Sequence, residues 1–368
     1  MPVYFAPGRV NLIGEHTDYN GGFVFPCALD FGTRLTIIPN SERILRFRSA
    51  NMPQTVEIPV TGPFSPLPDH CWVNYPLGCI AQLVEQTELP SGYDLIYEGN
   101  VPLGAGLSSS ASIEVVTAYA FNDILKLGLD RTQLALVAQK AEHTFAGVHC
   151  GIMDQFVSAQ GKPDNAIFLN CDTLQFDYVP LRLENVSIVL TNSHSPHKLD
   201  AGTYNQRVSE CQEAVRQISR CKPIGRLADL TPSEFQSLQS AITDPVILRR
   251  ARHVVTEIQR TREAVNALKS NDLTTFGQLM NQSHISLRDD YEVTGLELDT
   301  LAQTAWQIGG VIGSRMTGGG FGGCTVSLVK NEAIDTFRQT VSEVYERETG
   351  LQAEFYIART GDGARRIE

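Results

Sequence analysis

Long hydrophobic runs are missing from this chain of 368 residues. No apolar stretch approaches the roughly 18 residues that a membrane-spanning helix needs. The N-terminal segment MPVYFAPGRV also lacks the charged region and apolar core of a secretory signal. We therefore expect a cytoplasmic protein that does not have a membrane as its partner.

Paired cysteines are missing as well. The eight cysteines are scattered, and none forms a C-x-x-C pair. A chain of this size can build a core without disulfides, so we expect reduced, buried thiols. His143, His149 and Cys150 lie close in sequence, but their spacing matches no zinc motif.

Positive charge is scarce, because 30 Lys and Arg oppose 41 Asp and Glu, for a net charge of −11. This balance argues against nucleic acid as a partner, although a local basic site for a phosphate stays possible. The hydrophobic content of 42% is typical of a globular chain, and the length suggests two domains. The character of the sequence changes near residue 180, so we expect α+β domains at 1–180 and 181–368.

Periodicity predicts the main elements. Strands are expected at 93–97, 186–190 and 325–329. Helices are expected at 113–127, from an N-cap at Thr132, from Asp154 towards Gly161, and at 204–218, 245–269, 272–282 and 332–348.

The first stretch whose side chains could take part in binding or catalysis is residues 8–22, which place five polar or ionisable groups between turn glycines. Its carboxylates and imidazole could bind several hydroxyl groups, and Arg9 could stabilise a phosphoryl group. A solvated loop with Asx turns is the competing interpretation.

The second stretch, residues 102–112, is a glycine-serine turn between an expected strand and an expected helix. Glycines allow phosphates to approach the backbone, and the helix N-terminus offers free N–H groups. Ser110 could offer its hydroxyl to Mg²⁺. A turn with a serine N-cap is the alternative.

The third stretch is residues 150–155, with Glu142 twelve positions before Asp154. A carboxylate near a helix start could take or orient a hydroxyl proton, and Glu142 could complete a Mg²⁺ site with Ser110. Helix capping by Asp154 and an exposed position for Glu142 are the alternatives.

The fourth stretch, residues 316–324, contains the pattern G-x-G-x-x-G at 318–323. A dinucleotide-binding motif should open a helix, whereas this one leads into the strand expected at 325–329, so we reject that interpretation. Such a dense glycine loop lets two backbones, or a backbone and a ligand, come close.

Taken together and in this order, these stretches resemble the GHMP small-molecule kinases, and among them the branch that phosphorylates galactose. The resemblance covers the whole chain. Its anchors are GRVNLIGEHTDYN at 8–20, VPLGAGLSSSAS at 101–112, GIMDQ at 151–155 and MTGGGFGG at 316–323.

The resemblance implies a fold and an activity. The fold is α+β, with a ribosomal-S5-like N-terminal domain, a ferredoxin-like C-terminal domain and the site in the cleft between them. The activity is ATP- and Mg²⁺-dependent phosphorylation of the anomeric hydroxyl of α-D-galactose, the first committed step of galactose catabolism. We expect a monomer whose partners are the sugar and ATP.

The resemblance also implies roles for residues. Asp154 and Arg9 match the catalytic pair, and Ser110 and Glu142 match the Mg²⁺ positions. The positions that match sugar contacts are Glu15, His16, Thr17, Asp18, Gly151, Asp154 and Tyr204. The positions that match nucleotide contacts are Ser49, Trp72, Tyr75, Gly104, Ala105, Gly106, Leu107, Ser108, Ser109 and Ser110.

Three alternatives stay open at this point. A sister kinase would act on N-acetylgalactosamine or arabinose. A galactose-sensing regulator would bind the sugar without catalysis, although the presence of all the catalytic groups favours an enzyme. A nucleotide-binding scaffold would have no use for a sugar pocket.

Overall fold

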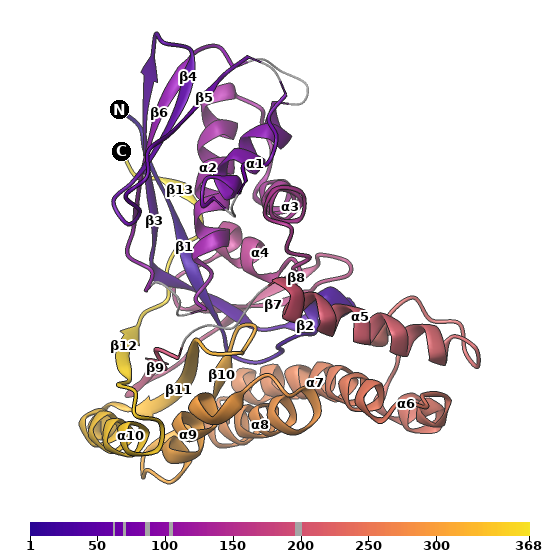
Figure 1. The fold of residues 1–368 in the computed structure, drawn as a ribbon. Helices are drawn as coiled ribbons and strands as arrows, with labels where there is room; N and C mark the ends of the chain where they lie inside the picture. The colour runs from indigo at the N-terminus through magenta and orange to yellow at the C-terminus, as the bar shows by residue number, and fades with distance from the viewer. Residues whose placement is uncertain (62, 69–70, 85–88, 103–105, 196–200) are drawn as a thin grey trace.

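The computed structural model describes residues 1–368 except 62, 69–70, 85–88, 103–105 and 196–200. Every helix in the described part of the chain is too short or too polar to cross a bilayer. Figure 1 shows an upper part built mostly from the first half of the chain and a lower part built mostly from the second half.

The upper part is a six-stranded sheet covered on one face by four helices (Figure 1). The strands, in sheet order, are β13 (Arg365–Arg366), β1 (Val3–Asn11), β3 (Pro26–Asn40), β6 (Gly92–Gly99), β4 (Ile44–Ser49) and β5 (Val56–Pro59). The helices are α1 (Asn74–Leu83), α2 (Ser109–Leu125), α3 (Arg131–Ala141) and α4 (Met153–Gln160). Among the strands of the described residues, only β4 and β6 pair in parallel. Apolar side chains such as Phe47 and Phe121 fill the space between sheet and helices.

The lower part is a four-stranded antiparallel sheet packed against helices. Its strands, in sheet order, are β10 (Val311–Thr317), β11 (Cys324–Lys330), β9 (Val186–Asn192) and β12 (Glu354–Ala358). The helices of this part are α5 (Ala201–Ile218), α6 (Pro232–Leu238), α7 (Pro245–Lys269), α8 (Leu273–Ser286), α9 (Gly295–Trp306) and α10 (Ile334–Thr349). A small third sheet contains β2 (Phe23–Val24), β7 (Asn165–Asn170) and β8 (Phe176–Pro180).

The predicted strands and helices are confirmed, with one error at a helix start. Helix α3 begins at Arg131, and its N-cap is Asp130 rather than Thr132. The Asp130 carboxylate accepts the Gln133 N–H while the Gln133 side chain accepts the Asp130 N–H. This reciprocal capping box satisfies two backbone donors at once, which the Thr132 hydroxyl cannot do.

The two parts share a core at their junction. One apolar cluster joins Val10 and Leu12 of the first half to Phe276 and Cys324 of the second. The chain also crosses back at its end, because β13 pairs with β1 and brings both termini to the same edge (Figure 1). The protein is an α+β fold, and the division at residue 180 stays a prediction.

Candidate active site

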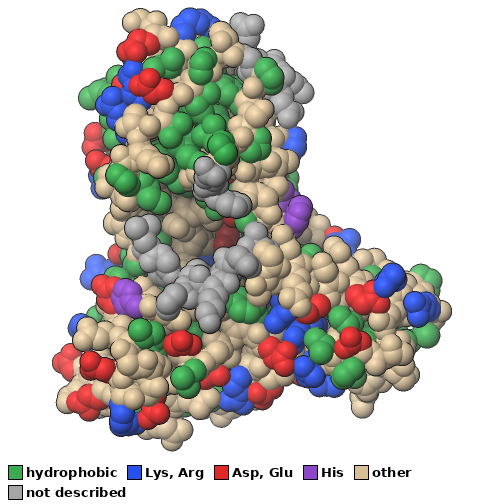
Figure 2. Space-filling view, in the orientation of Figure 1, with side chains coloured by type: hydrophobic (Ala, Val, Ile, Leu, Met, Phe, Trp, Pro, Cys, Tyr) green, Lys and Arg blue, Asp and Glu red, His purple; other side chains and the backbone are tan. Residues whose placement is uncertain are grey.

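Two adjoining cavities form the candidate site. The first lies between the upper and lower parts, where Figure 2 shows a hollow beneath a patch of hydrophobic side chains, and the second is lined by residues of the upper part alone. The first cavity has a volume of about 330 Å³. It is lined by Arg9, Glu15, His16, Asp18, Tyr75, Gly106, Leu107, Ser108, Ser109, Ser110, Glu142, Val148, Cys150, Gly151, Met153, Asp154, Tyr204, Gly318 and Gly319. The second has a volume of about 180 Å³ and shares Tyr75, Ser109 and Ser110 with the first.

The polar stretch at residues 8–22 is no solvated loop. Residues 3–11 form β1, an inner strand of the upper sheet between β13 and β3, and most of the residues that follow up to 22 are buried. Buried carboxylates and guanidinium groups persist only when they are paired or hydrogen-bonded. The stretch therefore places charged groups where the fold must give each of them a partner.

Arg9 and Asp154 form the central pair of the first cavity. Arg9 Nε donates to Asp154 Oδ1 at 2.8 Å, and Arg9 Nη2 donates to Oδ2 at 2.7 Å. The Arg9 side chain is 5% exposed, whereas that of Asp154 is 27% exposed and reaches the cavity. Asp154 lies in the first turn of α4, whose N-terminal dipole favours a negative charge.

The glycine-serine loop forms hydrogen bonds with the same pair. Arg9 Nη1 donates to the Gly106 carbonyl at 2.8 Å, and the Ser108 hydroxyl donates to Asp154 Oδ2 at 2.5 Å. Ser108 occupies the N-cap position of α2, as the alternative expected for a serine of this turn, but its side chain makes no capping bond there. The predicted nucleotide contacts Gly104 and Ala105 lie outside the described residues.

The N-terminus of α2 faces both cavities. Ser109 and Ser110 open this helix and line both cavity walls. The first N–H groups of a helix have no partner within it, so they can receive an anion such as a phosphate.

Ser110 and Glu142 suit Mg²⁺. The Ser110 hydroxyl donates to the Glu142 carboxylate, and both residues line the first cavity. Burial and the nearby Asp154 raise the pKa of Glu142 to about 7, against hydrogen bonds from Cys150, Gln155 and Ser110. Within the described residues Glu142 has no ion-pair partner, so a cation would compensate its buried charge. Mg²⁺ prefers such oxygen ligands and fills its other positions with water and substrate phosphates.

A second carboxyl group stands behind Glu142 and was missed by the sequence analysis. Glu114 of α2 is fully buried, and Gln155 Nε2 donates to the carboxylates of both Glu114 and Glu142. Burial and the charge of Glu142 raise the pKa of Glu114 well above its usual range. Glu114 lies off the apolar stripe at 113, 116, 120, 124 and 127 that predicted this helix, so the spacing gave no signal for its burial.

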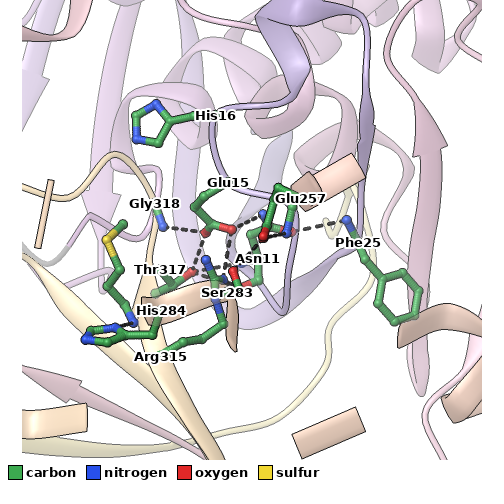
Figure 3. Close-up of polar contacts among 12 residues, drawn as sticks. Asn11, Glu15, His16, Phe25, Glu257, Ser283, His284, Arg315, Thr317 and Gly318 are labelled. Atoms are coloured by element: carbon green, nitrogen blue, oxygen red, sulfur yellow. Dashed lines mark hydrogen bonds and ion pairs between the residues drawn. The ribbon is translucent and has the colours of Figure 1, made fainter. Parts of the chain in front are cut away.

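Glu15 lies at the meeting point of the two parts (Figure 3). Its carboxylate accepts bonds from Asn11 Nδ2 at 2.5 Å and from the Gly318 N–H at 2.8 Å, and it pairs with Arg315 at 2.8 Å. Burial raises the pKa of Glu15 to about 7, and the charge of Arg315 is the largest opposing influence. Glu257 holds the backbone nearby by accepting the Gly14 N–H.

His16 lines the cavity with both of its ring nitrogens occupied. Nε2 lies 3.1 Å from the Gly319 carbonyl, which can only accept, so Nε2 carries the proton. Nδ1 then accepts from the Tyr19 hydroxyl at 2.9 Å. Burial lowers the pKa of His16 to about 3, which keeps the ring neutral. The ring therefore presents its carbon surface to the cavity, with the Tyr204 ring 5.8 Å away.

Thr17 differs from the other predicted sugar contacts. It is fully buried, and its hydroxyl bonds the carbonyls of Gly14 and Phe23 instead of lining the cavity. It shapes the turn that carries its neighbours Glu15 and Asp18.

Asp18 and Gly151 depend on each other. A Cβ atom on Gly151 would lie 1.9 Å from Asp18 Oδ2, so a glycine is required for this approach. Burial and the charge of Asp154 raise the pKa of Asp18 to about 6. Tyr204 of α5 lines the same wall of the cavity.

The glycine loop at 318–323 connects β10 to β11, which confirms the rejection of a dinucleotide motif. It also confirms the predicted close approach of two backbones. A Cβ on Gly318, which has φ +83°, would lie 3.0 Å from the Gly106 carbonyl. The loop thus brings the lower part against the glycine-serine loop of the upper part.

The second cavity gathers the three remaining predicted nucleotide contacts, Ser49, Trp72 and Tyr75. Its other lining residues include Met52, Tyr97, Val101 and Ile113. Aromatic and aliphatic walls of this kind can hold a flat, apolar ring system next to a phosphate site.

Three family models match the chain. The galactokinase galactose-binding signature matches residues 2–39, the GHMP kinase N-terminal domain matches 74–162, and the GHMP kinase C-terminal domain matches 264–347. The first of these matches covers the stretch that carries Arg9, Glu15 and Asp18.

Full-length relatives point the same way. A galactokinase of Fusobacterium nucleatum is 49% identical over 99% of this chain and 95% of its own, and one of Bacillus subtilis is 44% identical over 100% and 95%. The crystal structure of Lactococcus lactis galactokinase complexed with galactose superposes with a TM-score of 0.96, at 40% identity over 100% of this chain and 95% of that one. The mevalonate kinase of Methanococcus jannaschii, 18% identical over 98% of both chains with a TM-score of 0.72, shares the fold. On these matches and on the site built above, the chain belongs to the galactokinase family of GHMP kinases.

Proposed function

We propose that the protein is a sugar 1-kinase that transfers the γ-phosphoryl group of ATP to the anomeric hydroxyl of α-D-galactose, giving galactose 1-phosphate and ADP. The observation that carries the proposal is the Arg9–Asp154 pair, which joins the phosphate loop to the cavity lined by Glu15 and Asp18. Family membership supports galactose as the sugar.

Asp154 has room for one more hydrogen bond. Its Oδ2 accepts from both Arg9 and Ser108, whereas Oδ1 accepts from Arg9 alone. Each carboxylate oxygen has about two lone-pair sites, so Oδ1 is the atom that receives the sugar hydroxyl. There Asp154 takes or orients the hydroxyl proton while the sugar oxygen forms its bond to phosphorus.

The other residues bind and position the reactants. The α2 N-terminus with Gly106 to Ser110 holds the phosphates. Trp72 and Tyr75 form walls of the site for the adenine ring. Ser110 and Glu142 would hold Mg²⁺, which neutralises phosphate charge when it is bound. Arg9 stabilises negative charge on the transferred group. Glu15, Asp18 and Tyr204 bind the sugar hydroxyls.

We further propose that the protein acts in the cytoplasm as a monomer whose domains meet near residue 180. A single chain supplies both cavities, so the reaction needs no second copy.

The test is ADP release with Mg-ATP across galactose, N-acetylgalactosamine, arabinose and glucose. Asp154→Asn should lose most of the galactose-dependent turnover and still bind galactose, whereas Asp335→Asn, on the exposed start of α10, should behave as wild type. Preference for another sugar would favour a sister kinase. Galactose binding by the wild type without any turnover would favour a sensor.

A further inference from the structure

We propose that Arg315 is a positioning residue for sugar recognition: it holds Glu15 charged and aimed into the cavity, so that strand β10 of the lower part sets the affinity for the sugar. This inference rests on the proposed function, since it takes Glu15 to bind the sugar. Nothing in the motifs that led to the family assigns a role to this arginine.

Arg315 occupies an unusual place for a charge. It is the only charged residue between Asp299 and Lys330, and its side chain is fully buried. Removing a guanidinium group from water costs several kcal/mol unless a partner compensates. The cost of burying Arg315 must therefore be offset by the groups that its side chain contacts.

Its charged partner is Glu15. Arg315 Nη1 lies 2.8 Å from Glu15 Oε2 and donates to the Asn11 carbonyl at 3.3 Å. Nε and Nη2 make no hydrogen bond to the described residues. Glu15 is therefore the carboxylate with which Arg315 forms its ion pair, and the Arg315 charge also acts on the nearby Glu257 and His253.

The end of β10 completes the environment of the carboxylate (Figure 3). The Gly318 N–H donates to Oε1, and the Thr317 hydroxyl accepts the Asn11 N–H at 3.1 Å and lies 3.0 Å from the Asn11 carbonyl. These contacts join the ends of β1 and β10, so Glu15 cannot turn without breaking the junction between the two parts.

The charges around Glu15 are finely balanced. Arg315 and the more distant Arg9 favour the ionised form, whereas Glu257 of α7 and burial oppose it. His253, whose Nε2 bonds the Glu15 carbonyl, is neutral because burial lowers its pKa to about 4. The net result is a Glu15 pKa of about 7, so loss of the Arg315 charge would leave the carboxyl protonated at neutral pH.

The test compares Arg315→Met and Arg315→Lys with wild type by two measurements. Infrared difference spectra across pH follow the Glu15 carboxyl band, which the Glu15→Gln variant identifies. Calorimetric titration with galactose gives the Kd at each pH. The matched control is Arg250→Met, which removes another buried arginine, one that pairs with Glu210 and Glu292.

The proposal expects the Glu15 midpoint near 7 in wild type and at least about one pH unit higher in Arg315→Met, because a close opposite charge shifts a carboxyl pKa by about 1–3 units. The galactose Kd of Arg315→Met at pH 7 should be about fivefold weaker or more, because a one-unit shift lowers the ionised fraction of Glu15 from about one half to about one tenth. The difference in Kd between this variant and wild type should shrink as pH rises. Arg315→Lys should give a Glu15 midpoint and a galactose Kd between those of wild type and Arg315→Met. Arg250→Met should leave the Glu15 midpoint where it is in wild type, even if this variant is less stable.

An unchanged Glu15 midpoint in both Arg315 variants would overturn the proposal, as would a shifted midpoint that leaves the galactose Kd unmoved. If wild type neither binds nor phosphorylates galactose, the proposed function fails instead. The infrared titration, which needs no sugar, still decides whether Arg315 keeps Glu15 charged.

Discussion

Arg9 and Asp154 stand 145 positions apart in the chain and meet as a two-point ion pair, with Nε and Nη2 each within 2.8 Å of a different carboxylate oxygen. A lysine keeps the charge but cannot bond both oxygens and the Gly106 carbonyl together. Arg9→Lys should therefore lower kcat by about a hundredfold and change the KM for galactose much less. Arg34→Lys, on an exposed position of β3, is the control. A KM effect with normal kcat would assign Arg9 to sugar binding instead.

Glu142→Gln tests the proposed Mg²⁺ site. The amide keeps an acceptor for Gln155 and loses the negative charge, so the fold should tolerate it. We expect the Mg²⁺ concentration for half-maximal turnover to rise by about tenfold or more, as for other lost metal-site partners. Glu332→Gln, at an exposed acid, should titrate as wild type. An identical Mg²⁺ curve for Glu142→Gln would remove Glu142 from the site.

Gly151→Ala should damage sugar binding selectively. The new Cβ would overlap the Asp18 carboxylate and push it from its place in the cavity wall. The expected result in steady-state kinetics is a KM for galactose raised by about tenfold, with the KM for ATP changed little. Gly309→Ala is the matched control, because a Cβ there meets nothing within 4 Å. Equal changes in both KM values would point to general distortion.

Trp72 should report on the nucleotide. The chain has two tryptophans, and only Trp72 lines the second cavity. Trp72→Ala removes a large aromatic surface, so the KM for ATP should rise by about tenfold, whereas the KM for galactose should not change. In Trp306→Phe, quenching of fluorescence by ATP should persist, and in Trp72→Phe it should vanish. Quenching that survives in Trp72→Phe would place the adenine elsewhere.

His253 should make the protein sensitive to acid. Burial lowers its pKa to about 4 from 6.5, so between these values the unfolded chain binds a proton that the native state does not. Stability is therefore fully present above pH 6.5 and falls as pH drops towards 4.

Between pH 7.5 and pH 5, the free energy of unfolding should fall by about 2 kcal/mol less in His253→Gln than in wild type. Urea unfolding at both pH values measures the difference. His194→Gln, whose ring is about half exposed, is the control. Acid sensitivity that is the same in wild type and His253→Gln would contradict the assignment.

Residues with a periodic or motif-bearing context could be predicted from the sequence. The helix at 204–218 was found because its apolar positions repeat with helical spacing, and the strand at 325–329 because it is an apolar run after a glycine cluster. The cavity residues Arg9, Ser110 and Asp154 stood out because they lie beside glycines or helix starts, but only the resemblance to the GHMP kinases decided their expected roles.

What depends on contacts between distant segments could not be predicted. Spacing alone does not show that Arg9 pairs with Asp154, or that the Thr17 hydroxyl turns to the backbone. Arg315 carried a signal, a lone charge in an apolar strand, but its meaning needs the position of Glu15. Strand β13 had no signal at all, because two arginines at a chain end show neither apolar alternation nor a turn.

The pairing of β13 with β1 orders events during synthesis. Gly361 bonds Ala28, and Ile367 bonds Val3, so the sheet that carries Arg9 gains its outer strand only from residues translated long after β1. Such long-range pairing slows folding. A nascent chain stalled before residue 360 should therefore expose the open edge of β1 to chaperones, and synthesis of β13 should close that edge.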